Sequence, residues 1–410
     1  MEQAARDLAS HLRQQQPDLE DIAYTLNMRR TIHNKISLIP AVGLENLCSR
    51  LDQLASHQAT KEILTLQWRS GSSPKTAFLF SGQGGQWLGM GMALAEQEPV
   101  FRESLAAFDD IFIAQGGFSI RAEISPRGDD PARLNNTTIV QPAIAAIQIA
   151  LARMLISYGV APDAIVGHSI GEVAAAHIAG ALSLEEAVKV IYFRSQIQSQ
   201  AAGVGAMLAT GISSKEAEQM IQRRQMGGIV EIAAFNGPNM TTLTGSTTEL
   251  EQLASELEAR GAFARFVKVD VPYHSRFMDP LENDLIAALS SVQGKQTDVI
   301  LYSTVTTLIE SGTHLTGKYW FENVRKPVRF FETAARMLED GCNFLVEIGP
   351  HPVLISGTRE IAESTRWPVH ILPAMVRGSE TEPVSCLIGA AYTIGAGADL
   401  QLFNGGEGVS

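Results

Sequence analysis

The spacing of apolar residues differs between parts of this chain, and each spacing predicts a different set of helices and strands. In residues 1–73, apolar side chains recur at intervals of three and four, most clearly in 44–57, which predicts amphipathic helices with one strand at 35–39. From residue 76 to about residue 200, short apolar runs alternate with long helical segments. That alternation predicts a parallel sheet covered by helices.

Residues 205–270 have a different order of elements. Two predicted helices, at 215–224 and 249–260, lie among four short runs that are typical of strands. The predicted strands are 206–210, 229–235, 240–244 and 263–269. A strand–helix–strand–strand–helix–strand order is the split βαβ arrangement of a ferredoxin-like subdomain. After Asp270 the α/β pattern resumes and ends near Ile361.

The elements predict an α/β protein in four segments. A run of turn-forming residues at 70–74 separates the first segment from the second. From about residue 377 the sequence thins into a Gly-rich stretch. The segments are an α/β linker domain at 1–73, a large α/β subdomain at 74–204 and 271–376, the ferredoxin-like subdomain at 205–270, and a C-terminal linker at 377–410.

Composition narrows the classes of function. With 410 residues, 45% hydrophobic and 19% charged, the chain is long enough for two or three domains and reads as an ordinary globular protein. A formal net charge of −12 argues against nucleic acid as a partner. The longest apolar stretch, 139–156, is interrupted by polar residues, so we predict a buried helix and no membrane span.

The cysteines and the first residues indicate where the protein works. Cys48, Cys342 and Cys386 are widely scattered, without metal-ligand spacing or a disulfide framework. The first seven residues lack the basic and apolar layout of a signal peptide. We therefore expect a reduced, cytoplasmic setting and no bound metal.

The run Gly167-His168-Ser169-Ile170-Gly171 follows a predicted buried strand at 164–166. A strand that enters Gly-x-Ser-x-Gly and then a helix is typical of the nucleophile elbow of α/β-hydrolase-like folds, in which a tight turn exposes the serine. The helix would direct its unpaired N–H groups and positive dipole end at the charge that develops in acyl transfer. Alone, the run is equally consistent with a Gly-rich turn and a capping serine.

Four further stretches place polar groups where an acyl-transfer site needs them. Gln83 follows the first α/β strand, so its loop lies at the carboxyl edge of the sheet and can offer a backbone N–H and an amide to an oxyanion. Arg194 can fork onto a substrate carboxylate, and His274 can activate a serine. The fourth stretch, 347–354, is a strand followed by a rigid turn. Each of these features also has a structural explanation when it is taken alone. The Gln83 stretch could be a Gly-rich turn, Arg194 a solvated helix residue, and His274 a structural histidine.

Taken in order, these motifs resemble the malonyl-CoA:acyl-carrier-protein transacylase family, and closely its acyltransferase domain as embedded in modular polyketide synthases. Residues 1–73, which include the run 21–30, resemble the linker that joins such a domain to its upstream ketosynthase. The resemblance covers most of the chain, and the ordered set is highly specific. Its motifs are Phe80-Ser81-Gly82-Gln83-Gly84, Gly167-His168-Ser169-Ile170-Gly171-Glu172, Tyr273-His274-Ser275 and Glu347-Ile348-Gly349-Pro350.

The resemblance implies a reaction and its partners. A malonyl-type group would pass from coenzyme A to a serine, and then to the phosphopantetheine thiol of an acyl carrier protein. A ketosynthase domain of the same polypeptide would be a further partner. Acyl-CoA would be a substrate, with no permanently bound cofactor, no metal, no nucleic acid and no membrane.

The resemblance also implies a role for each site residue. Ser169 would be the nucleophile and His274 the general base. Arg194 would pair with the free carboxylate of the malonyl-type group. The remaining roles are an oxyanion hole of Gln83 with the backbone N–H of Ile170, a main-chain carbonyl of Asn323 that orients His274, and pocket positions at Gln141 and Asn236.

The tetrad that ends in the catalytic histidine marks substrate specificity in this family. Malonyl-specific domains commonly carry His-Ala-Phe-His there, and methylmalonyl-specific ones Tyr-Ala-Ser-His. This chain has Val271-Pro272-Tyr273-His274, in which the bulky Tyr273 would crowd an α-methyl group. The residue after the nucleophile is Ile170, where methylmalonyl domains often have Gln. Both features favour malonyl, whereas Val271 departs from both patterns.

Two alternatives from other classes are considered. A serine hydrolase, such as an editing thioesterase of a polyketide assembly line, would share Ser169 and His274 but would not need Arg194. A non-catalytic domain kept for architecture would be free to lose Ser169, His274 or Gln83, and all three are present. For a carrier protein, which is acidic in this family, the candidate docking cations are Arg276, Arg325, Lys326 and Arg329.

Overall fold

A computed structural model gives the fold, and it describes residues 1–410 apart from 30–32, 58–62, 69–72, 127–130 and 404–410. The chain divides into two compact units. One unit contains 1–74, 158–160 and 381–410, and the other contains 75–157 and 161–380. Most of the predicted linker at 70–74 lies outside the described residues.

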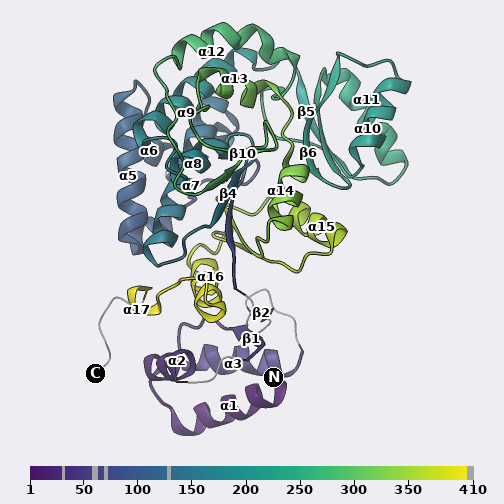
Figure 1. The fold of residues 1–410 in the computed structure, drawn as a ribbon. Coiled ribbons are helices and arrows are strands. Elements are labelled where there is room, and N and C mark those ends of the chain that lie inside the picture. Colours follow the sequence, from purple (N-terminus) through teal and green to yellow (C-terminus); the bar gives the residue numbers. More distant parts are fainter. Residues whose placement is uncertain (30–32, 58–62, 69–72, 127–130, 404–410) are drawn as a thin grey trace. The chain divides into compact units, whose positions relative to one another are not determined.

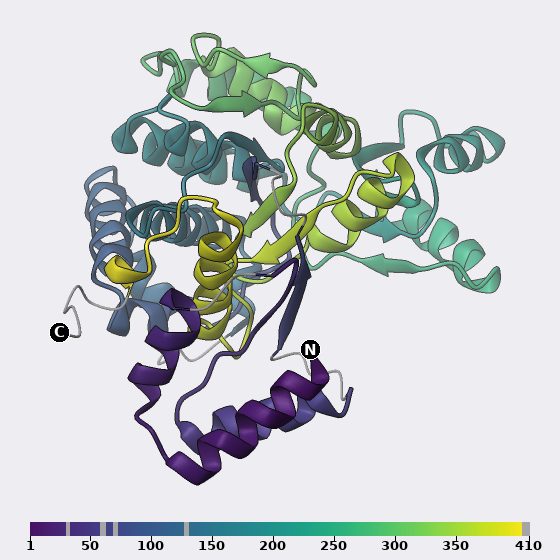
Figure 2. The same ribbon diagram turned by 60° about the horizontal axis from the view of Figure 1, so that its bottom comes forward.

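The first unit is a small helical layer beside a two-stranded sheet. Helices α1 and α3 pack side by side through Leu12, Leu47 and Leu51 (Figure 2). Strands β1 and β2 pair antiparallel, with Ile36 opposite Leu66. Its elements are α1 (Glu2–Gln15), α2 (Leu19–Met28), β1 (Lys35–Leu38), α3 (Leu44–Ala55), β2 (Leu64–Gln67), α16 (Thr381–Ile394) and α17 (Leu400–Phe403).

Three elements of this unit were not predicted: β2, α16 and the short α17. Strand β2 carries an apolar–polar alternation, Leu-Thr-Leu-Gln, that is short but has the period of a half-buried strand. Helix α16 occupies part of the stretch expected to thin into Gly-rich sequence, and it buries an apolar stripe that includes Val384, Leu387 and Ile388.

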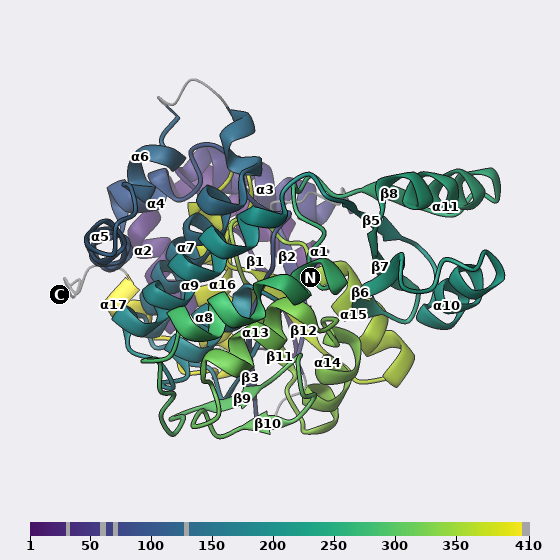
Figure 3. The same ribbon diagram turned by 90° about the horizontal axis from the view of Figure 1, so that it is seen from above.

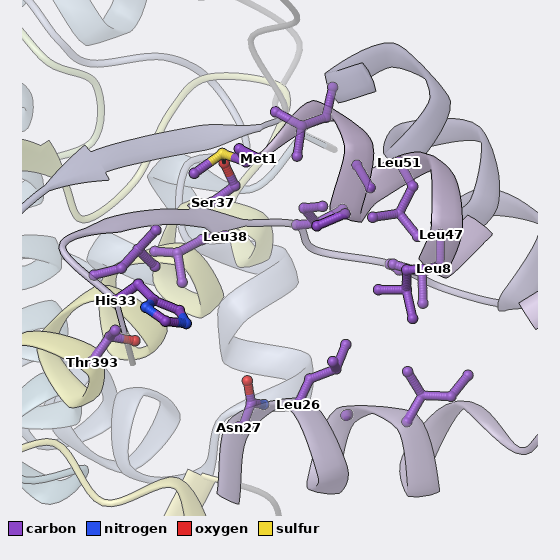
Figure 4. A pocket seen from close by; sticks show the side chains of 18 of the residues that line it. Met1, Leu8, Leu26, Asn27, His33, Ser37, Leu38, Leu47, Leu51 and Thr393 are labelled. Atoms are coloured by element: carbon purple, nitrogen blue, oxygen red, sulfur yellow. Dashed lines mark hydrogen bonds between the residues drawn. The ribbon is translucent and has the colours of Figure 1, made fainter. Parts of the chain in front are cut away.

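A pocket with largely aliphatic walls lies in the same unit, among α1, α2, α3, β1 and α16. Figure 4 shows Leu8, Leu26, Leu47 and Leu51 around it. None of the predicted site residues lines this pocket.

The second unit is built on a six-stranded sheet in the order β10-β9-β4-β3-β11-β12, and its strands run parallel except β10. The strands are β3 (Thr76–Phe80), β4 (Ala164–Gly167), β9 (Ile300–Tyr302), β10 (Ile309–Glu310), β11 (Phe344–Ile348) and β12 (His370–Pro373). The parallel α/β sheet expected from the alternating pattern is confirmed.

Helices cover this sheet because its strands are apolar on both faces. Ala77 and Leu79 of β3 face α14 and α15, and α8 contacts β3 and β4 (Figure 1). The helices are α4 (Met92–Gln97), α5 (Pro99–Ala114), α6 (Ile120–Ile124), α7 (Thr137–Ser157), α8 (Gly171–Ile178), α9 (Leu184–Gln198), α12 (Glu282–Ala288), α13 (Gly317–Arg325), α14 (Phe330–Glu339) and α15 (Ile355–Thr365), with 3₁₀ turns η1 (Pro131–Asn135), η2 (Ser199–Ala201) and η3 (Arg276–Leu281).

Helix α7 is the central helix of this unit. It is long and apolar enough to cross a membrane by composition, but 89% of its most apolar window is buried inside the protein. Its burial is all round, as the buried residues from Ile139 to Leu155 show. The predicted buried helix is therefore a core helix of the α/β unit.

The small subdomain has the expected order of elements. Its antiparallel sheet has the strand order β6-β7-β5-β8, and α10 and α11 pack on it through Met220, Leu250 and Leu257 (Figure 3). The elements are β5 (Ala206–Thr210), α10 (Ser214–Arg223), β6 (Val230–Gly237), β7 (Met240–Gly245), α11 (Thr247–Ala259) and β8 (Ala264–Phe266). The last strand is shorter than predicted because the chain leaves the sheet after Val267, whose N–H still bonds to Met207.

The turn between β4 and α8 has the tight geometry expected of a nucleophile elbow. Ser169 has φ 53°, in the left-handed region that a non-glycine residue seldom adopts. A Cβ added at Gly167 would lie 2.3 Å from the Glu172 nitrogen, and one added at Gly171 would lie 2.3 Å from the Phe80 carbonyl oxygen. Only glycine fits at these two positions, because rigid backbone atoms block any larger residue.

We therefore expect Gly171→Ala to force β3 and α8 apart and to displace Ser169. The free energy of unfolding should fall by about 1–3 kcal/mol or more, the usual cost of overpacking. Gly227→Ala is the matched control, because no heavy atom lies within 4 Å of its added Cβ. Urea unfolding of both variants checks this, and equal midpoints would contradict the packing argument.

Candidate active site

Ser169 and His274 lie in direct contact, although one follows β4 and the other follows the small subdomain. The Ser169 Oγ and the His274 Nε2 are 2.8 Å apart. His274, like Ser169, has a positive φ, of 57°, and it is almost fully buried. The predicted nucleophile and base are thus within hydrogen-bonding distance.

A main-chain carbonyl fixes the orientation of His274, but it is not the one predicted. The His274 Nδ1 lies 2.8 Å from the carbonyl oxygen of Lys326, whereas the prediction named Asn323. Lys326 follows α13 in extended backbone, as the residue before Pro327 favours, so its carbonyl turns out of the helix. A carbonyl can only accept, so Nδ1 carries the proton and Nε2 is left to accept from Ser169.

Asn323 belongs to the site through its side chain instead. Its Nδ2 donates to the carbonyl oxygen of Ser169 at 3.1 Å and to Glu172 Oε2 at 2.9 Å. Glu172 also accepts from Thr304 and from Tyr319, and burial raises the pKa of this carboxyl. This buried network fixes the first turn of α8 beneath the serine.

Arg194 of α9 is 1% exposed and lies against the nucleophile. Its Nη2 donates to Ser169 Oγ at 3.1 Å and to Asn323 Oδ1 at 3.4 Å. Its Nη1 donates to Gln141 Oε1 at 2.5 Å and to Gln198 Oε1 at 3.0 Å. Among the described residues no carboxylate lies within 4.0 Å of it, and burial lowers the pKa of Arg194 to about 10.

The predicted oxyanion-hole groups have N–H donors that no protein acceptor occupies in the described part of the chain. In the described part of the chain, the backbone N–H groups of Gln83 and Ile170 have no protein acceptor. The side-chain Nε2 of Gln83 is buried, makes no hydrogen bond within 3.5 Å there, and interacts only weakly with the Tyr273 hydroxyl. Ile170 precedes the first residue of α8, so its N–H is one of the unpaired groups at that helix end. Buried donors without acceptors can bind a developing oxyanion.

The two predicted pocket residues, Gln141 and Asn236, have different hydrogen-bond partners. Gln141 joins the Arg194 network, and its Nε2 donates to Gln198 Oε1 at 3.0 Å and to Gln83 Oε1 at 3.4 Å. Asn236, in contrast, holds His168, with its Oδ1 2.8 Å from the His168 Nε2. This contact gives Asn236 a supporting role beside the elbow, and its place in the substrate pocket stays a prediction.

Tyr273 and Val271 are both buried beside His274. The Tyr273 hydroxyl lies 2.5 Å from Thr137 Oγ1, which in turn donates to Asp270 Oδ1 at 2.5 Å. Burial raises the pKa of Tyr273 to about 12, so the ring is neutral and held in place. Tyr273 is therefore a buried side chain whose hydroxyl is anchored on Thr137.

Sequence reasoning missed Gln198 and Lys326. Gln198 lies one helical turn beyond Arg194, and that spacing places the two side chains on the same face of α9. The four-residue spacing from Arg194 was therefore a signal in the sequence by which Gln198 could have been found. Lys326 contributes only a backbone atom, for which its residue type gives no signal.

Burial lowers the pKa of His274 to about 3, and the charge of Arg194 acts in the same direction. The imidazole is therefore neutral at any pH near neutrality. A neutral imidazole with its Nε2 on a serine hydroxyl can accept that proton as the serine attacks a carbonyl carbon. The arrangement suits acyl transfer through a covalent acyl-serine.

Comparison with known proteins agrees with this chemistry. The acyl transferase domain family matches residues 77–397. The chain belongs to that family. The acyltransferase domain from module 8 of the salinomycin polyketide synthase has the same fold, with TM-score 0.89 and 29% identity over 98% of this chain and 94% of that one.

Two other proteins extend the comparison. An erythronolide synthase of Saccharopolyspora erythraea is 34% identical over 97% of this chain, which spans 11% of that synthase. The malonyl CoA-acyl carrier protein transacylase of Coxiella burnetii is 27% identical, with TM-score 0.68, over 77% of this chain and 97% of that one. The acyltransferase domain of a polyketide synthase predicted from the motifs is thus confirmed as the family and the fold.

The candidate docking cations of this acyltransferase domain already have partners. Arg325 pairs with Glu231 and Asp279, Lys326 with Glu322, and Arg329 with Glu332. The Arg276 side chain donates to the Gly228 carbonyl. These contacts offset part of the positive charge at the four positions, and docking of a carrier protein there stays a prediction.

The depressed pKa of His274 sets the pH dependence of this acyltransferase domain. A histidine with the ordinary pKa of about 6.5 would be about 90% protonated at pH 5.5 and would lose about tenfold in rate. With the pKa lowered to about 3, the base stays neutral, so the rate of serine acylation should change less than about twofold between pH 8 and pH 5.5. Initial rates by intact-mass spectrometry check this, and an inflection near pH 6.5 would contradict it.

Proposed function

We propose that this acyltransferase domain loads a malonyl-type extender unit from coenzyme A onto Ser169 and then onto the phosphopantetheine thiol of an acyl carrier protein in polyketide biosynthesis. One observation carries the choice of a dicarboxylic acyl group. Arg194 is a fully buried cation beside the nucleophile, and all its described hydrogen-bond partners are neutral. The free carboxylate of a malonyl group would supply the missing counter-ion.

The first half-reaction uses Ser169 and His274. As the Ser169 Oγ attacks the thioester carbon, His274 Nε2 takes the hydroxyl proton. The negative charge that forms on the carbonyl oxygen is stabilised by the N–H of Ile170 and by Gln83. When the carbon–sulfur bond breaks, His274 returns the proton to the coenzyme A thiolate, and malonyl-Ser169 remains.

The second half-reaction runs through the same groups in reverse. His274 takes the proton of the carrier-protein thiol, whose sulfur attacks the ester carbon of malonyl-Ser169. The carbon–oxygen bond to Ser169 breaks, and Oγ recovers its proton from His274. A malonyl thioester of the carrier protein leaves, and the free enzyme is restored.

The backbone partner of His274 suits transfer better than hydrolysis. A carboxylate partner would stabilise the imidazolium and strengthen the base, whereas the carbonyl of Lys326 mainly sets its orientation. The acyl-serine must survive until a thiol arrives, so weak activation of water is an advantage. An editing hydrolase would also have no use for Arg194.

The proposal extends to the setting of the domain. Residues 1–73 and 377–410 would be the linkers before and after the acyltransferase domain, and the ketosynthase would lie in the same polypeptide. The protein would act in the cytoplasm without a permanently bound cofactor. The erythronolide synthase match supports this setting because that relative is far longer than this chain.

Arg194→Ala tests the carboxylate selection. Losing a buried charged pair costs about 2–5 kcal/mol, so malonyl transfer should fall about 30-fold to several thousandfold relative to acetyl transfer. Arg359→Ala, at an exposed arginine of α15, is the matched control and should leave the ratio unchanged. Acylation rates with malonyl-CoA and acetyl-CoA check this. An unaltered malonyl-to-acetyl ratio in the Arg194 variant would contradict the claim that Arg194 selects acyl groups with a free carboxylate.

Tyr273 is expected to favour malonyl over methylmalonyl, because its ring is held by Thr137 where an α-methyl must fit. One methylene-sized difference is worth about 1–3 kcal/mol, so equal concentrations of the two thioesters should give about tenfold or more malonyl product. Tyr273→Ser should shift the product ratio toward methylmalonyl, and Tyr273→Phe, which keeps the ring but loses the bond to Thr137, should shift it less. A wild-type preference for methylmalonyl would contradict this role of Tyr273 and would mean that Val271 sets the space for the α-substituent.

A further inference from the structure

The guanidinium of Arg194 is fully engaged at its outer edge before any substrate arrives. Its two terminal nitrogens carry four N–H bonds, and each has a neutral acceptor: Gln141 and Gln198 on Nη1, and Ser169 and Asn323 on Nη2. The Nε–H of Arg194 is buried and has no partner among the described residues. One N–H bond cannot hold both oxygens of a carboxylate, so a substrate that forks onto Arg194 must displace one or more of the four acceptors. The question is which acceptor yields.

The four acceptors are not held equally firmly. Asn323 is anchored by its own donations to the Ser169 carbonyl and to Glu172. Gln141 is anchored by donations to Gln83 and Gln198. Ser169 is the reacting group.

Gln198 is the acceptor with the weakest support. Its side chain is fully buried, yet its Nε2 has only the sulfur of Met278, at 4.0 Å, as a partner. A thioether is a weak acceptor, so the Gln198 amide group is held mainly through its oxygen, which accepts from Arg194 Nη1 and from Gln141 Nε2, each at 3.0 Å. When Gln198 withdraws, Gln141 keeps its donation to Gln83 Oε1. Gln198 also lies at the last residue of α9, where the helix passes into a 3₁₀ turn.

We propose that Gln198 is a neutral placeholder for the substrate carboxylate. In the empty site its Oε1 satisfies Nη1 of Arg194, and it withdraws when a carboxylate takes that position. A buried donor without an acceptor is costly, so Gln198 stabilises the empty enzyme and any state with a neutral acyl group. It thereby lowers the preference of the enzyme for malonyl over acetyl, and this inference rests on the proposed function.

The charge-matched variant Gln198→Glu gives the sharpest test. The new carboxylate would pair with Arg194 permanently and would take the place of the substrate's carboxylate. The malonyl-to-acetyl ratio of acylation rates should fall at least about 30-fold, with acetyl-CoA still accepted. Gln196→Glu, on the same helix but without a hydrogen bond to Arg194, is the control and should keep the wild-type ratio.

Gln198→Met separates a placeholder from a group that binds the substrate directly. Without the amide, the empty and acetyl-bound states leave an Arg194 N–H unpaired, whereas the malonyl-bound state does not. The malonyl-to-acetyl ratio should therefore rise about five-fold or more, and malonylation should raise the Tm of this variant more than that of the wild type. A fall in the ratio would overturn the placeholder and make Gln198 a direct carboxylate donor.

The malonyl-to-acetyl ratio of the wild type separates two claims, the selection of carboxylates by Arg194 and the placeholder role of Gln198. A wild-type ratio near one contradicts the selection of carboxylates by Arg194, and the placeholder fails with it. A high wild-type ratio that persists in Gln198→Glu contradicts the placeholder alone. If Gln198→Glu does not fold, as circular dichroism would show, the Gln198→Met ratio decides the inference.

Discussion

Arg194 is buried without a carboxylate in contact among the described residues, and this is the constraint on which the rest of the site depends. A buried charge is costly unless it is paired or well hydrogen-bonded, and here four neutral acceptors share that task. Three helices and the elbow supply these acceptors, so the fold must bring α7, α9, α13 and Ser169 together around one cation. The proposed selection of a dicarboxylic acyl group follows from the same imbalance of charge.

The buried carboxylate of Glu172 builds the elbow and does not activate the base. Glu172 is held by Thr304, Tyr319 and Asn323, which leaves none of its hydrogen bonds for His274. His274 takes a backbone carbonyl instead, and burial keeps its imidazole neutral. This division gives a base of moderate strength beside a rigid serine, which agrees with an acyl-enzyme that waits for a thiol.

Much of this arrangement could be predicted from local sequence, because the elbow, the parallel strands and the split βαβ order each have a short-range signal. What failed depends on tertiary direction. Asn323 was placed correctly near His274, but the turn before Pro327 gives the carbonyl role to Lys326. The contact of Asn236 with His168 was also not foreseen, because it joins β6 of the small subdomain to the elbow, and residue type alone does not reveal a tertiary contact. Helix α16 was missed because Gly-rich neighbours masked its apolar stripe.

The most direct test of the account is intact-mass spectrometry of the wild-type protein after incubation with an equimolar mixture of acetyl-, malonyl- and methylmalonyl-CoA. The account predicts one dominant adduct with the mass of a malonyl group, and peptide mapping should place it on Ser169. An adduct on another residue would contradict the nucleophile, and a dominant acetyl adduct on Ser169 would contradict the role of Arg194.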